Sequence, residues 1–354
     1  MESIKKVVIV VCVIIGTLIG AGFASGKEIY LFFSKYGIYG IIGAVVSSIL
    51  TAVIILKVLK ISRNNNLTNN NKFVEKITKN KEIASIIKNI INMFLFISYW
   101  IMSTGLATFF KQEMGIPIVI TSTLNSVVVY FIFMKSVKGI MNLNSIVVPI
   151  MIIIILVISM KNFPVSDFFT YTNDIYKKAP VAETMPDAIK ATTKAILYTS
   201  YNSITLIPII VTLSSSINKK KEIRGVSLIT GILVFILIFS IYKMLILSNL
   251  NIKLYEIPVL EILSGFTMTE KILYEIAIVA AIFTSEISAG FGILENIRDK
   301  EKYKIVALIM CMLGIPISYI GFGRLVEVLY PVFGIIGLLQ IILIVAFRAK
   351  VNYK

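Results

Sequence analysis

The 354-residue sequence contains no histidine and only two cysteines, and these absences exclude several classes of function. Without histidine there is no Ser-His catalytic triad, no histidine general base and no histidine metal ligand. Cys12 and Cys311 each stand in an apolar run, and two isolated cysteines build neither a disulfide framework nor a metal cluster. The sequence therefore predicts a protein that is not an enzyme and that holds no organic cofactor.

Charged residues are also scarce, at 15% of the chain against about 25% in typical soluble domains. Hydrophobic residues make up 57%, and the mean hydropathy is +0.89. This composition predicts an all-α polytopic membrane protein whose constant partner is the lipid bilayer. Ten apolar runs are expected to cross it, at about 7–34, 38–59, 84–110, 117–134, 143–160, 188–213, 226–247, 269–294, 304–320 and 325–347.

The net charge of +16 is explained by the distribution of basic residues over the loops. Of the 35 lysine and arginine residues, 23 lie in one alternating set of loops, and the other positions hold nearly equal numbers of basic and acidic residues. That set comprises the N-terminus, 57–88, 135–138, 219–224, 298–304 and the C-terminal tail. The positive-inside rule makes these loops cytoplasmic, so both termini are predicted inside and no nucleic-acid partner is needed.

Two further segments are predicted on the opposite, external side of the membrane. The segment 161–187 reads as an external loop, and 251–265 as an external segment with a short amphipathic helix. On the cytoplasmic side, a short amphipathic helix is expected at about 72–82.

The first apolar run is interrupted at residues 16–26, which read Gly-Thr-Leu-Ile-Gly-Ala-Gly-Phe-Ala-Ser-Gly. Glycine permits unusual backbone angles, and unwound backbone at membrane depth is tolerated only where it lines a cavity or is buried in protein. Free N–H groups near Ser25 would face an anion, and free carbonyls from Gly16 to Ile19 would face a cation. A glycine-rich face for close helix packing is the competing interpretation.

The sixth run has a polar centre at residues 198–203, Tyr-Thr-Ser-Tyr-Asn-Ser, which predicts a second interruption. Breaks in runs 1 and 6 of ten indicate one transmembrane domain over 1–354, built from two inverted halves at about 5–161 and 187–348. Alternatively, these polar side chains hydrogen-bond to a neighbouring helix.

The string Gly16-Thr-Leu-Ile-Gly20-Ala-Gly22 resembles the first-helix motif of the amino acid–polyamine–organocation transporters. The longer string from Gly20 to Ile29 is similar to the YkvI group of bacterial membrane proteins in that superfamily. The resemblance implies the LeuT-like fold of five plus five helices with helices 1 and 6 interrupted. It further implies coupled uptake of amino acids or related small zwitterions through the bacterial cytoplasmic membrane.

The resemblance also implies a sodium site, with Na⁺ as the coupling ion. Ala281-Ile-Phe-Thr284-Ser285 reproduces the spacing by which sodium-coupled LeuT-like proteins hold Na⁺, and the carbonyls of Gly16 and Ile19 would complete the shell. Positions i, i+3 and i+4 lie on one helical face. The alternative is that the two hydroxyls bond to their own helix. Run 143–160 contains no internal lysine that would replace the cation in certain proton-coupled relatives.

The predicted substrate site combines the first break, the polar centre of run 6 and one residue of run 3. Tyr99 enters by resemblance, because the third helix of LeuT-like proteins lines the site. The predicted residues are Gly20, Ala21, Gly22, Phe23, Ala24, Ser25, Gly26, Tyr99, Thr199, Tyr201, Asn202 and Ser203. Glu286, a carboxylate in the middle of run 8, is either a protonatable coupling group or the partner of a lysine.

Two functions therefore compete. The first is a sodium-coupled secondary transporter of an amino acid-like solute by alternating access, with proton coupling through Glu286 as a variant of it. The second is a ligand-sensing receptor on the same scaffold, similar to spore-germinant receptor subunits. The intact pattern for cation binding favours transport.

Overall fold

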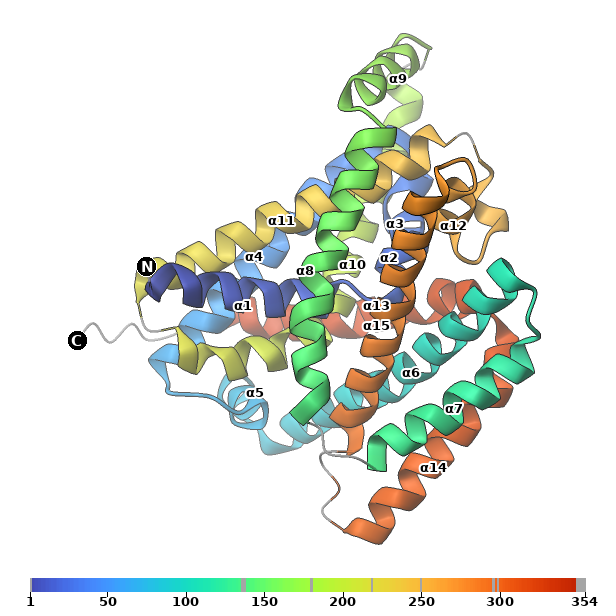
Figure 1. Ribbon diagram of the computed structural model, residues 1–354. Helices are drawn as coiled ribbons and strands as arrows, with labels where there is room; N and C mark the ends of the chain where they lie inside the picture. Colours follow the sequence, from blue (N-terminus) through green and yellow to red (C-terminus); the bar gives the residue numbers. More distant parts are fainter. Residues whose placement is uncertain are drawn as a thin grey trace.

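A computed structural model describes residues 2–134, 138–178, 181–217, 219–248, 250–294, 297 and 299–347. Within these residues all regular structure is helical, as predicted (Figure 1). The long helices are α1 (Glu2–Leu18), α4 (Gly40–Asn64), α6 (Lys81–Met114), α7 (Ile118–Met134), α8 (Lys138–Asn162), α9 (Val165–Lys178), α10 (Val181–Leu213), α11 (Lys220–Leu247), α13 (Met268–Leu294), α14 (Lys300–Ile317) and α15 (Phe322–Ala346). The short ones are α2 (Ala21–Ala24), α3 (Lys27–Phe32), α5 (Asn70–Thr78), α12 (Pro258–Leu263), and the 3-10 turns η1 (Ser34–Tyr39), η2 (Ser214–Ser216), η3 (Ile252–Leu254) and η4 (Ser318–Ile320).

Seven helical stretches in the described part of the chain are long and apolar enough to cross a membrane. An eighth is added if α8 and α9, which meet at a bend of 60°, are counted as one span. The two other predicted spans, 7–34 and 117–134, correspond to the broken series α1, α2, α3 and to the 17-residue apolar helix α7. Membrane crossing by several helices is thus supported, and the number ten stays a prediction.

The structure corrects two predictions about helix boundaries. The expected break at 198–203 is wrong, because α10 continues through these residues from Val181 to Leu213. The segment 161–187 is not a loop, because it contains α9 and the start of α10; α9 projects from the end of the helix bundle in Figure 1. The two short helices expected near 72–82 and within 251–265 are present as α5 and α12.

Helix α7 shows how this fold distributes polarity. Its buried face carries Thr121, Ser122, Asn125 and Ser126, whereas apolar side chains such as Leu124 are exposed. A water-soluble protein buries apolar side chains and exposes polar ones. An inverted helix of this kind is stable where lipid covers the apolar face and neighbouring helices satisfy the polar one.

The helices pack in two groups. On one side α11 packs on both α1 and α4, and α4 also packs on α10. On the other side α6, α7 and α14 lie together, with α13 against α6 (Figure 1). Helix α15 packs on both α10 and α6, and α8 packs on both α13 and α1. The broken segment α1–α3 lies between the two groups, because α2 contacts α13 and α3 contacts α10, α11 and α15.

Candidate functional site

The first helix is broken at the position that its glycines predict. The backbone ladder of α1 ends with the hydrogen bond from Ile19 N to Ile15 O (2.9 Å) and resumes with that from Ala24 N to Gly20 O (3.0 Å). The carbonyls between these ladders, from Gly16 to Ile19, therefore lie outside the regular helical hydrogen bonding. A second discontinuity follows at Gly26, whose φ of 81° lies in the left-handed region that favours glycine.

Helix α13 runs alongside this break. The hydroxyl of Tyr274 donates to the carbonyl of Ala24 (3.1 Å), and Ser285 Oγ lies 3.8 Å from the position that a Cβ would take at Gly20. Two of the predicted elements of the sodium site, the break in the first helix and the Thr-Ser pair of run 8, are therefore neighbours in space.

The individual predicted sodium ligands differ in their surroundings. Ile19, Ala281 and Thr284 are buried, and Ser285 is half-buried. The Thr284 hydroxyl donates to its own helix, at Ala280 O (2.8 Å) or Ala281 O (3.3 Å), which is the alternative that the sequence left open. Its oxygen still has lone pairs to offer. Gly16 lies against α8, since a Cβ there would come 2.9 Å from Val148.

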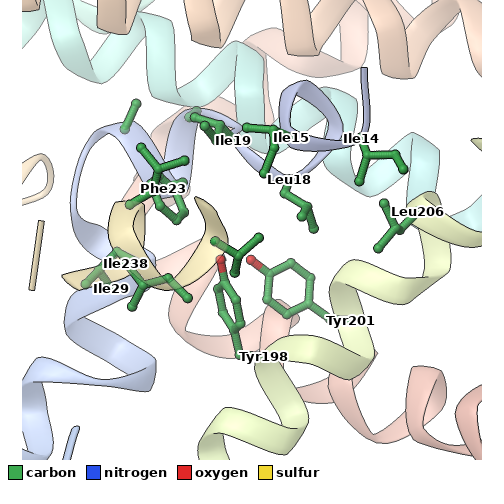
Figure 2. Packing of buried hydrophobic residues seen from close by; sticks show 14 of the residues in the cluster. Ile14, Ile15, Leu18, Ile19, Phe23, Ile29, Tyr198, Tyr201, Leu206 and Ile238 are labelled. Atoms are coloured by element: carbon green, nitrogen blue, oxygen red, sulfur yellow. The ribbon is translucent and has the colours of Figure 1, made fainter. Parts of the chain in front are cut away.

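The residues of the break itself are buried, and Ser25 already uses its hydrogen-bonding groups. Its hydroxyl donates to Gly22 O (3.0 Å) and accepts the backbone N–H of Lys27 (3.3 Å), and its carbonyl accepts Val259 N (3.1 Å). Some of the N–H groups that were predicted to bind an anion therefore already have a hydrogen-bond partner within the protein. Ala21, Phe23 and Ala24 belong to the apolar core, with Phe23 visible there in Figure 2.

Among the predicted site residues of α10, Tyr201 forms a hydrogen bond with the broken helix. Thr199 bonds to Ser47 Oγ of α4 (2.9 Å), whereas Asn202 and Ser203 donate to carbonyls of their own helix, at 3.0 and 2.6 Å. These internal bonds explain why α10 is continuous: the polar side chains return to the helix instead of replacing its ladder. Figure 2 shows Tyr201 beside Tyr198, projecting toward Leu18 at the end of α1.

The hydroxyl of Tyr201 donates to Glu28 Oε2, and Glu28 is the site residue that the sequence interpretation missed. Glu28 lies one residue into α3 and is 3% exposed. The sequence contained a signal for it, because an acidic residue two positions after a glycine-rich break in an apolar run is costly unless it has a function or a partner.

Glu286 lies in a separate polar cluster between α6, α7, α13 and α14. Its side chain is fully buried, and Asn125 Nδ2 donates to Oε1 (2.8 Å) and to Ser103 Oγ (3.2 Å). Among the described residues Glu286 Oε2 and Asn125 Oδ1 have no hydrogen-bond partner. One of the two interpretations of Glu286 was that it pairs with a lysine. Among the described residues no lysine forms an ion pair with Glu286.

Tyr99 belongs to this cluster and not to the broken helix, which corrects its expected role. Its hydroxyl donates to Cys311 Sγ (3.4 Å), and its ring packs with Phe133 in a core distinct from that around the break. The contact of α6 with the break comes instead from Met102, nearly one turn further along, whose Cε lies 3.7 Å from the Cβ position of Gly20.

Comparison of the sequence with known proteins gives two full-length relatives. The chain is 28% identical over 332 residues to the uncharacterized membrane protein YkvI of Bacillus subtilis, covering 92% of this chain and 91% of the relative. It is 24% identical over 345 residues to the uncharacterized protein YyaD of Bacillus subtilis, covering 96% of each. No family model matches the sequence.

Two solved structures align with the fold over most of its length. One is a manganese transporter of Eremococcus coleocola, with a TM-score of 0.44 and 13% identity over 96% of this chain and 70% of that one. The other is a Na⁺-coupled sialic acid symporter, with a TM-score of 0.47 and 16% identity over 95% of this chain and 84% of that one. Both scores lie below 0.5, too low to transfer a residue role or a substrate.

The apolar outer faces of the helices and the buried polar site at the broken helix are typical of a membrane protein. The full-length sequence similarity leads to the same class. The chain is a multi-helix membrane protein homologous to YkvI-type membrane proteins.

Proposed function

We propose that the chain is a secondary active transporter that couples uptake of an amino acid or a related small zwitterion to Na⁺ by alternating access. The observation that carries this proposal is the break of the first helix at Ile19 and Gly20, directly beside Ser285 of α13. Irregular backbone at membrane depth is characteristic of transporter binding sites, where it supplies carbonyls to cations.

The coupling ion would be held by oxygen atoms from two elements. The carbonyls of Gly16 and Ile19 lie outside the helical ladder, and Ala281, Thr284 and Ser285 stand at i, i+3 and i+4 of the facing helix. Carbonyl and hydroxyl oxygens suit hard cations better than soft ones. Ion binding there would tie α1 to α13 and thereby bias one access state over the other.

The helix pairings support a repeat of two inverted five-helix halves, at 5–161 and 187–348. Numbering the ten proposed spans from α1–α3 to α15, α4 packs on α11, α6 on α13 and α7 on α14, which pairs spans 2, 3 and 4 with 7, 8 and 9. The remaining contacts also exchange under a shift of five spans: α4 with α10 matches α11 with α1, and α8 with α13 matches α15 with α6. An odd number of spans per half makes the halves inverted, the arrangement in which one bundle can rock against the other.

Transport by purified protein in proteoliposomes tests the proposal. We expect an inward Na⁺ gradient to drive accumulation of at least one labelled amino acid, and Thr284→Ala or Ser285→Ala to remove the Na⁺ dependence. The matched control is Thr193→Ala, because the Thr193 hydroxyl also bonds within its helix, to Ile189 O (2.9 Å), but is exposed and distant in sequence from the break.

Unchanged Na⁺ dependence in both α13 variants would eliminate the sodium site. Binding without accumulation, for any solute that stabilises the protein, would replace transport by ligand sensing.

Proton coupling is the second candidate, and the geometry of Glu286 favours it. A fully buried carboxylate with one hydrogen-bond donor and one unpartnered oxygen requires a positive charge or a proton for stability. If protons drive transport, a pH gradient will support accumulation without Na⁺, and Glu286→Gln will abolish it. The sodium mechanism predicts that Glu286→Gln retains Na⁺-driven uptake.

A further inference from the structure

Glu28 is placed over the broken helix by the short helix α3. Its carboxylate folds back toward α2, so that a Cβ at Gly22 would overlap Glu28 Oε1. Tyr201 of α10 donates its hydroxyl to the other oxygen, Oε2. The side chain is 3% exposed, so this carboxylate is buried between α2, α3 and α10, close to the break.

Aromatic rings from three helices gather around Tyr201, the residue whose hydroxyl contacts this carboxylate. The ring of Tyr201 is stacked between Phe32 of α3, at 5.6 Å between centroids, and Tyr330 of α15, at 4.6 Å. Tyr198 meets the edge of both Phe32 and Tyr201 at 5.5 Å. Tyr198 and Tyr330 are therefore each one ring away from the Tyr201 hydroxyl that donates to Glu28. Ring faces attract cations, most strongly where water is excluded.

No basic side chain compensates Glu28 in the part of the chain that the structure describes. The adjacent Lys27 is turned elsewhere, with Nζ 3.1 Å from Tyr255 O and 3.5 Å from Glu327 Oε1. A single hydroxyl donor satisfies a buried carboxylate poorly, because an unpaired charge in a low-dielectric interior is costly. Like Glu286, Glu28 is therefore stable only with a proton or with a positive group that none of the described residues provides.

We propose that Glu28 and the rings of Phe32, Tyr198, Tyr201 and Tyr330 form the subsite for the ammonium group of the transported solute. The proposal rests on the proposed function and narrows it: the solute carries an amine, as an amino acid or a simple alkylamine does, and a carboxylic acid without an amine is rejected. The ammonium group pairs with the Glu28 carboxylate and contacts the ring faces, whereas an anion in the same place is repelled by that carboxylate.

Matched triads of ligands test this subsite by thermal stability of the purified protein in detergent, since a ligand that binds the folded state raises its midpoint. The triads are alanine, ethylamine and propionate; leucine, isoamylamine and 4-methylvalerate; and phenylalanine, phenethylamine and 3-phenylpropionate. We expect the amino acid and the amine of at least one triad to stabilise the protein, and its deaminated acid to have no effect.

In Glu28→Gln the affinity for those ligands should fall by about tenfold or more, because the amide keeps the shape but loses the charge. Glu222→Gln is the matched control, because this buried carboxylate lies at the start of α11, where it accepts the hydroxyl of Ser3 (2.6 Å), and belongs to neither proposed site; it should keep full affinity. Stabilisation by a deaminated acid equal to that by its amino acid, unchanged affinity in Glu28→Gln, or no stabilisation by any amine would overturn the subsite.

If Glu28→Gln does not fold, the pair Tyr330→Phe and Tyr330→Leu gives the answer. The phenylalanine variant keeps the ring face and should keep amine binding, whereas the leucine variant should lose it; equal affinities would contradict the subsite. Uptake separates this proposal from the function on which it rests. If amines bind but Na⁺ drives no uptake, the subsite is supported and the transport function is contradicted. If Na⁺-driven uptake occurs and is unaffected by Glu28→Gln, transport is supported and the subsite is contradicted.

Discussion

Two glycines of the first helix have distinct physical roles. Gly26 adopts a left-handed backbone at φ 81°, which allows the chain to leave α2 and begin α3 in a new direction. Gly22 has ordinary helical geometry, but its missing side chain provides the space into which the Glu28 carboxylate folds. The glycine-rich string therefore both bends the helix and accommodates a buried charge.

Gly22→Ala should damage the site directly. A Cβ at this position overlaps Glu28 Oε1, so either the carboxylate or α2 must move, and overpacking of this kind costs about 1–3 kcal/mol. We expect a lower thermal midpoint and loss of most ligand binding. Gly265→Ala is the control, because no atom lies within 4 Å of the corresponding Cβ position. Equal midpoints and equal binding in the two variants would show that the space at Gly22 is unimportant.

At the scale of elements, α3 is held at its outer side by α15 and the segment before α12. Lys27 is 5% exposed and pairs with Glu327 of α15 at 3.5 Å, while Glu256 accepts the backbone N–H of Gly323 at the start of α15. The ion pair thus links α3 directly to α15, and the ring of Tyr330 stacks on Tyr201 of α10, which donates to Glu28.

Glu327→Gln should loosen α3. Partly exposed ion pairs contribute about 0.5–1 kcal/mol, so local opening should become roughly twofold to fivefold more frequent. Hydrogen exchange of the α3 amides, followed by mass spectrometry in detergent, would report this increase. In the control Glu301→Gln, which removes an exposed pair with Lys304 (3.0 Å), exchange in α3 should stay unchanged. Equal exchange rates in both variants would exclude the fastening role.

At the scale of the whole molecule, the distribution of charge bears on which side of the membrane each loop faces, and the packing of the helices bears on how the halves of the chain are arranged. Of the 35 lysine and arginine residues, 23 stand in alternate loops, which predicts which face of the bundle is cytoplasmic. The pairing of α4 with α11, α6 with α13 and α7 with α14 is the one expected of the proposed two halves that cross the membrane in opposite directions. A chain with an even number of spans then returns to the side on which it began.

Fusions to the ends of the chain test this topology in bacterial cells. Green fluorescent protein fused to either terminus should fluoresce, because it folds in the cytoplasm, and alkaline phosphatase at the same position should be inactive. Insertion of alkaline phosphatase after Pro164, in the connection between α8 and α9, should give activity. A fluorescent N-terminal fusion combined with an active C-terminal phosphatase would require an odd number of spans and would refute the repeat.

Much of the fold follows from local properties of the sequence. Hydropathy predicted the positions of the long helices, and the glycines of 16–26 predicted the break, because both depend on short segments and their solvent. The polar centre 198–203 was misread for the opposite reason. Asn202 and Ser203 bond to carbonyls of their own helix, so polarity alone did not reveal whether the ladder was broken.

The sequence by itself therefore determined a helical membrane protein with an interrupted first helix, since apolar length and missing Cβ atoms act residue by residue. Only the tertiary structure decided which side chains meet there. Tyr99 faces Cys311, whereas Tyr201, on a distant helix, reaches Glu28. These contacts depend on the rotation of each helix about its axis, and that rotation is fixed by packing against several neighbours at once.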